Sequence, residues 1–221
     1  MNEFIDMFSS SDPSNVATSV KLLLLLTVLS IAPGILILMT SFTRIIIVLS
    51  FVRTSLGTQQ MPPNQVLLGL ALFLTFFIMA PTFNQVYDEA LAPLFAEEIT
   101  LDEAYENAST PLKDFMAGHT RQKDLALFMN YSQIESPKSI QDIPLTTLVP
   151  AFAISELKTA FQMGFMIFIP FLVIDMAVAS ILMSMGMMML PPVMISLPFK
   201  ILLFVLVDGW YLITHSLLNG F

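Results

Sequence analysis

Three consecutive methionines stand directly before a proline pair in Gly186-Met187-Met188-Met189-Leu190-Pro191-Pro192, and long apolar segments lie on both sides of this stretch. Methionine is unbranched and polarisable, so it packs against surfaces of irregular shape. The prolines remove two backbone donors and disfavour helix at the residue before them. The stretch therefore predicts a forced turn between two membrane-type helices, with the methionines on the turn.

The composition is that of a membrane protein. The 221 residues are 56% hydrophobic and 12% charged, with a mean hydropathy of +0.79, whereas soluble domains are about 25% charged. An ordinary soluble enzyme is therefore excluded. There is no cysteine, and His119 and His215 lack metal-ligand spacing, so we predict neither a metal site nor a cofactor.

Four apolar segments frame the chain, and each pair is joined through a proline pair. The segments cover residues 22–43, 66–80, 159–183 and 194–218, and the joints are Pro62-Pro63 and Pro191-Pro192. A segment of 22 residues reaches about 33 Å as a helix, enough to cross a bilayer core. Short connections indicate antiparallel neighbours. We expect an all-α fold with an N-terminal segment, a first hydrophobic hairpin, an acidic helical region and a second hairpin with a Met-rich tip, at residues 1–20, 21–81, 82–150 and 151–221.

The acidity is confined to the long connection between the two hairpins. Residues 82–145 hold eleven acidic side chains and four basic ones, a balance that argues against nucleic-acid binding. Thr100 and Glu103 have capping-box spacing, and Thr110-Pro111 predicts a second helix start. An amphipathic stripe over 112–119 includes His119, which we interpret as a packing residue.

The first-hairpin tip is predicted to be cytoplasmic. Arg44 and Arg53 are assigned to that tip, while acidic residues dominate the preceding stretch, and cytoplasmic loops carry an excess of Lys and Arg. The acidic region and both termini are then extracytoplasmic. The amino-terminal stretch has no basic region of the signal-peptide kind, so either the sequence is mature as written or its first apolar segment inserts.

Charged residues inside the second hairpin need partners. Asp175, Lys200 and Asp208 interrupt apolar helices, where a charge costs about 3 kcal/mol and normally faces protein or water. Lys200 and Asp208 are too far apart along one helix to pair, so we expect partners elsewhere, with Glu156 and Lys158 as candidates. Buried ion pairs that fix assembly register are favoured over proton transport.

Long strings of this sequence resemble the FliP family of flagellar biosynthetic proteins. They include the 150–165 stretch with Ser155-Glu156-Leu157-Lys158-Thr159-Ala160-Phe161-Gln162-Met163-Gly164-Phe165, the methionine turn 186–192, and Leu197-Pro198-Phe199-Lys200 through Val207-Asp208-Gly209-Trp210. Arg53-Thr54-Ser55-Leu56-Gly57 and Gln59-Gln60-Met61-Pro62-Pro63-Asn64-Gln65 are similar to the family's first hairpin tip. The resemblance covers about residues 22–221.

The resemblance implies a non-enzymatic subunit of the flagellar type III export gate, in the bacterial cell membrane at the flagellar basal body. It implies a pentameric ring that assembles helically with FliQ and FliR, with FlhB as a further partner and unfolded flagellar proteins as substrates. Met187, Met188 and Met189 would form a pore gasket, and Glu156, Lys200 and Arg121 would be charged contacts within the ring. The related injectisome family, SctR, is the alternative.

Three classes are distinguishable from the residues alone. An ion- or proton-coupled transporter predicts a coupling site at Asp175 or Asp208, and an intramembrane enzyme predicts a nucleophile or paired catalytic carboxylates. A structural gate predicts a flexible apolar pore lining with charges at contacts. No recognisable catalytic or phosphate-binding motif is present. The methionine triplet alone is more typical of core packing, and its place before Pro-Pro together with the family resemblance favours the gate.

Overall fold

The computed structural model describes residues 13–58, 60–132, 137–187 and 189–221, and every regular element in these ranges is helical, which confirms the all-α prediction. The chain divides into two compact units, Met1–Leu38 and Met39–Phe221. The elements are α2 (Pro13–Leu38), α3 (Phe42–Ser55), α4 (Asn64–Val86), the π-helix η1 (Tyr87–Leu91), α5 (Ala92–Phe95), α6 (Leu101–His119), α7 (Gln122–Tyr131), the 3-10 helix η2 (Ile140–Asp142), α8 (Leu145–Ser184), α9 (Pro192–Leu206) and α10 (Gly209–Leu218).

The first expected apolar helix, 22–43, is wrong as a single element. Helix α2 ends at Leu38, and α3 begins at Phe42. At the break, the Phe42 N–H donates to the Thr40 hydroxyl oxygen over 3.4 Å, a local bond that competes with the helical pattern. The hairpin around Pro62-Pro63 is therefore formed by α3 and α4, both within the second unit.

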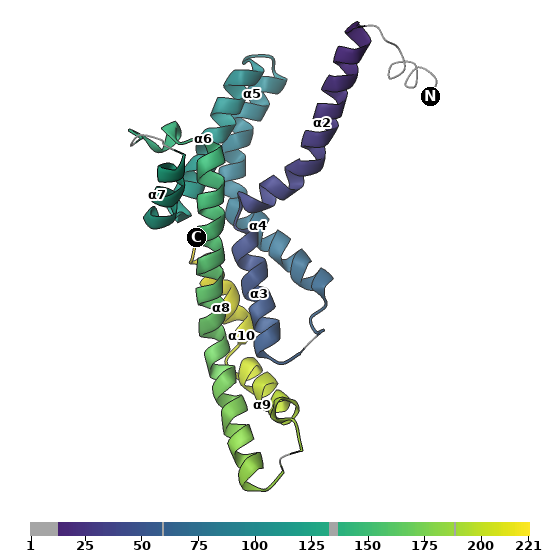
Figure 1. Cartoon of the computed structure of the whole chain (residues 1–221), viewed down its shortest axis with the longest axis vertical. Coiled ribbons are helices and arrows are strands. Elements are labelled where there is room, and N and C mark those ends of the chain that lie inside the picture. Colours follow the sequence, from purple (N-terminus) through teal and green to yellow (C-terminus); the bar gives the residue numbers. More distant parts are fainter. Residues whose placement is uncertain (1–12, 59, 133–136, 188) are drawn as a thin grey trace, which may run out of the picture. The chain divides into compact units, whose positions relative to one another are not determined.

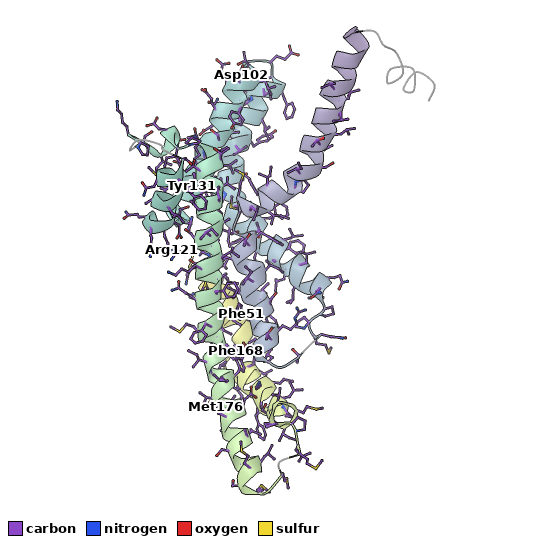
Figure 2. The ribbon with its side chains drawn as sticks, viewed as in Figure 1. Phe51, Asp102, Arg121, Tyr131, Phe168 and Met176 are labelled. Carbon is purple, nitrogen blue, oxygen red and sulfur yellow. The ribbon has the colours of Figure 1, made fainter. Side chains whose placement is uncertain are left out.

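Helix α8 is 40 residues long and runs along the length of the Met39–Phe221 unit (Figure 1). Its most extensive packing is against α3, whose Ile45, Val48, Leu49 and Val52 are fully buried. The two helices approach closely because Gly164 of α8 has no side chain: a Cβ there would overlap the ring of Phe51 of α3, which Figure 2 labels.

The last apolar segment, expected as one helix over 194–218, is broken. Helices α9 and α10 meet at an angle of 61°. Asp208 between them has a φ of 51°, a left-handed conformation that interrupts helical hydrogen bonding. Gly209 follows directly, and a Cβ there would overlap the Phe204 ring, so the bend depends on a glycine at this position.

The acidic region folds into helices, as predicted. Thr100 caps α6, and the reciprocal bonds of the capping box with Glu103 are both present, which confirms that helix start. The second start predicted at Thr110-Pro111 is wrong, because α6 continues through Pro111 to His119. Proline removes one backbone donor, and the packing of the face that carries the fully buried Met116 offsets that loss.

Two helical stretches of the described ranges are long and apolar enough to cross a membrane: Asn64–Phe95 and Leu145–Ser184. The bent pair of α9 and α10 is a third candidate if it counts as one span. The stretch Asn64–Phe95 continues past the boundary expected at residue 82, and Leu145–Ser184 begins before the boundary expected at residue 151. The acidic region is therefore joined to each hairpin by a continuous helical stretch.

Candidate functional site

The methionine turn lies at the tip of the second hairpin, between α8 and α9. Gly186 there has a φ of 77°, and Pro191 and Pro192 are the N-cap and first residue of α9. Met189 is 99% exposed and does not pack the chain against itself, while Met187 is 42% exposed and partly covered. Met188 lies outside the described residues.

The tip of the first hairpin repeats this chemistry in smaller form. Met61 is 72% exposed and precedes Pro62 and Pro63, with Pro63 as the N-cap of α4. Arg53 at the end of α3 donates to the side chain of Asn64 across the turn. Each hairpin tip thus presents methionine just before a proline pair that starts the next helix.

Glu156 of α8 is paired with Arg44 of α3. The pair is bidentate: Arg44 Nε donates to Glu156 Oε2 over 2.8 Å, and Arg44 Nη2 pairs with Oε1. Both side chains are buried. The sequence names Glu156 as a candidate partner for the charges of the second hairpin and places Arg44 near the first-hairpin tip. Instead, Arg44 lies buried at the end of α3 away from that tip and pairs with Glu156 itself.

Lys200 of α9 is paired with Asp175 of α8, at 2.6 Å between Nζ and Oδ2. The Ser196 hydroxyl donates to the other carboxylate oxygen of Asp175. The partner of Lys200 is therefore Asp175, which the sequence analysis identifies only as a second charge in need of a partner. The bond ties the two helices of the second hairpin together near its tip.

Arg121 and Asp124 dock α7 onto α8. Arg121 Nη2 lies 2.5 Å from Asp124 Oδ2, the Ser155 hydroxyl donates to the same oxygen over 2.6 Å, and the Arg121 N–H donates to Ser155 Oγ over 3.1 Å. Burial by itself raises the pKa of Asp124, but the hydrogen bonds from Ser155 and Arg121, with Lys158 nearby, hold that pKa below its usual value.

Two predicted charge positions have no ion pair among the described residues. Lys158 is exposed on α8, and Asp208 is exposed at the bend between α9 and α10.

The capping carboxylate of Glu103 has a pKa lowered by the Thr100 backbone N–H and hydroxyl. Arg44, Ser155 and Ser196 are not predicted as partners from the sequence; the one available signal is that Arg44 directly follows the uncharged apolar run 22–43.

These arrangements favour a structural role over proton-relay chemistry. The buried carboxylate of Glu156 and the half-buried carboxylate of Asp175 are each neutralised by a cation within hydrogen-bonding distance, which is typical of groups that fix helix packing. The exposed, flexible groups are instead the methionines at the tips. They can seal an apolar surface of variable shape without forming strong bonds.

Comparison with known proteins identifies the family. The model of the FliP family matches residues 25–217. Flagellar biosynthetic protein FliP of Bacillus subtilis (strain 168) is 78% identical over 221 residues, which cover 100% of this chain and 100% of that protein. Proteins of the same name from Pectobacterium carotovorum subsp. carotovorum and Caulobacter vibrioides are each 56% identical, covering 92% and 91% of this chain and 79% and 76% of theirs. The chain therefore belongs to the FliP family of flagellar biosynthetic proteins.

Proposed function

We propose that this chain is a structural pore subunit of the flagellar type III protein export gate. The observation that carries the proposal is the methionine turn, where Met187 and Met189 are exposed at the tip of an apolar hairpin. Several copies of this tip around one axis would gather thioether side chains into a plug. Such a plug excludes water and ions, yet an unfolded polypeptide can push it aside.

The exposed apolar surface supports assembly with other subunits. Phe73, Phe77 and Phe165 are among the large apolar side chains exposed on α4 and α8, and apolar surface of this kind can be covered by neighbouring subunits. We infer a homo-oligomeric ring, pentameric as the family resemblance implies, with FliQ, FliR and FlhB as partners and unfolded flagellar proteins as cargo. The place of action is the cell membrane at the flagellar basal body.

The gasket is tested by replacing Met187, Met188 and Met189 with alanine. The variant is expected to assemble as the native chain does but to leak small ions, because the plug shrinks while the buried contacts of the hairpin stay in place. The measurements are the assembly yield in detergent and the growth of cells under ionic stress.

Met61→Ala is the matched control, since it removes an exposed methionine before the other proline pair. It should leave both assembly and ion permeability unchanged. If the methionines instead pack a core, each truncation costs about 2 to 5 kcal/mol, and the triple variant loses assembly before any leak is seen. An assembled triple variant that does not leak also contradicts the gasket.

The transporter alternative receives no support from the geometry of the acidic residues. Asp175 already accepts from Lys200 and Ser196, and Asp208 is exposed at a helix bend. A coupling carboxylate in a membrane is ordinarily poised to exchange its proton. Asp208→Asn is therefore expected to leave export unchanged, and a complete loss of export with normal assembly would favour the transporter.

A further inference from the structure

Arg44 is held by more than its ion pair. Two of its nitrogens, Nε and Nη2, donate to Glu156, and the third, Nη1, donates to the backbone carbonyl of Gly220 over 2.6 Å. Its guanidinium carbon lies 3.8 Å from the centroid of the Phe221 ring. The segment Gly220-Phe221, here called the strap, thus satisfies the remaining donor group and covers one face of the cation.

The strap is held on its other side by α6. The Phe221 ring is stacked on Phe115, with centroids 6.0 Å apart and planes 14° apart, and its centroid lies 5.1 Å from that of His119. His119 Nε2 is 3.4 Å from the Phe221 carbonyl oxygen, which accepts when that nitrogen carries the proton. Phe115 also packs on Phe152 of α8. The strap therefore lies where α3, α6 and α8 meet.

Gly220 is the residue type that this approach requires. A Cβ at Gly220 would lie 3.2 Å from Arg44 Nη1 and 3.3 Å from the carbonyl oxygen of Ser216. Both distances are tighter than ordinary van der Waals contact, and neither neighbour is free to move, because the Arg44 guanidinium is held by Glu156 through its other two nitrogens and the Ser216 carbonyl is helix backbone. A side chain there would push the carbonyl away from Arg44.

We propose that Gly220-Phe221 is an intramolecular strap that locks the Arg44–Glu156 ion pair and thereby holds the first hairpin, the acidic region and the second hairpin in one register. A buried ion pair is stable only when its remaining donors are satisfied. A cation on an aromatic face gains most when it is shielded from water. The Gly220 carbonyl accepts the remaining donor of Arg44, and the Phe221 ring shields the cation from water. Gly220 and Phe221 are therefore positioning residues for Arg44.

The strap concerns the single chain and does not depend on the export-gate proposal. An ion pair that makes no further contacts keeps its attraction when the two charges are exchanged. The strap does not permit this exchange, because a carboxylate at position 44 would face the Gly220 carbonyl and the Phe221 ring, which both repel an anion. In full-length protein in detergent, the double variant R44E/E156R should melt as low as the single variants. Recovery of the native melting temperature by the double variant overturns the proposal.

A second set of variants tests the strap directly. Gly220→Ala and Phe221→Leu should each lower the melting temperature by about 4 °C or more, and each should lower it by less in an Arg44→Gln background, because residues that act together are not additive. Phe165→Ala, which removes an exposed ring from α8, is the matched control and should change little.

Phe221→Tyr keeps the ring and should behave as the native chain. If Phe221→Leu cannot be purified while Phe221→Tyr and Phe165→Ala can, the loss supports the strap. Equal loss of Phe165→Ala and Phe221→Leu overturns it. Melting within about 1 °C of native for both strap variants, or full additivity with Arg44→Gln, overturns it as well.

Discussion

Lys200→Met is the substitution whose cost can be worked out most directly from the structure. Methionine keeps most of the length of lysine but removes the charge, leaving the Asp175 carboxylate with Ser196 as its remaining side-chain donor. Removing one member of a buried ion pair costs about 3 to 5 kcal/mol. The Asp175 side chain is 20% exposed, and water can recover part of that loss, so we expect about 3 kcal/mol, at the lower end of the range.

The assay is unfolding of the detergent-solubilised chain, with the single variants Lys200→Met and Asp175→Asn and the double variant. The double variant carries no uncompensated charge and an amide can still accept from Ser196, so it should recover about 2 kcal/mol of the loss. Lys158→Met is the control, since Lys158 is exposed on α8 and should change stability by less than about 0.5 kcal/mol.

The reasoning is refuted if the losses of the two single variants simply add in the double variant. It is also refuted if Lys200→Met costs no more than Lys158→Met. Native mass measurement on the same samples extends the test to assembly: a hairpin that has lost the α8–α9 bond near its tip should yield fewer oligomers than the control.

Three further predictions use other parts of the chain. Gly164→Ala places a methyl group against the Phe51 ring and should cost about 1 to 3 kcal/mol, measured by thermal unfolding; native stability would contradict the close approach of α3 and α8. The pKa of Asp124 is lowered from 3.8, so its bonds should stabilise the fold above about pH 4, and this stability should be lost as the pH falls further. Ser155→Ala should make the free energy of unfolding depend less on pH in this range, and an unchanged dependence would count against the role of Asp124. A cysteine in place of the exposed Asp102 (Figure 2) should react with a membrane-impermeant thiol reagent in intact cells; labelling only after permeabilisation would reverse the predicted orientation.

The local chemistry of the sequence determined the helical class, the acidic region and the tips. Capping at Thr100 depends on residues three positions apart, and turns before Pro63 and Pro192 depend on the missing proline N–H. These are short-range interactions, so their geometry follows from the order of the residues. The strong resemblance of the long strings around Glu156 and Lys200 identified the family for the same reason, because it is a property of residue order.

The positions of the helix breaks depend on tertiary contacts as well as on the local sequence. The apolar run over 194–218 carries no glycine-proline turn to mark its bend, yet Asp208 takes a left-handed conformation next to Gly209. The bend lets the Phe204 ring lie against Gly209 and Trp210. Conversely, Thr110-Pro111 predicts a helix start, yet α6 runs through Pro111 because its apolar stripe packs on one side of the helix.

Only the tertiary structure decided which charges pair. Arg44 and Glu156 are separated by 112 positions and Lys200 and Asp175 by 25, and nothing in the sequence distinguishes these partners from the others available. In an apolar setting each buried charge must find an opposite charge and fill its remaining hydrogen bonds. That requirement predicts from sequence that partners exist, but which partner is within reach depends on how α3, α8 and α9 pack, because electrostatic pairing in a protein interior is set by distance through space.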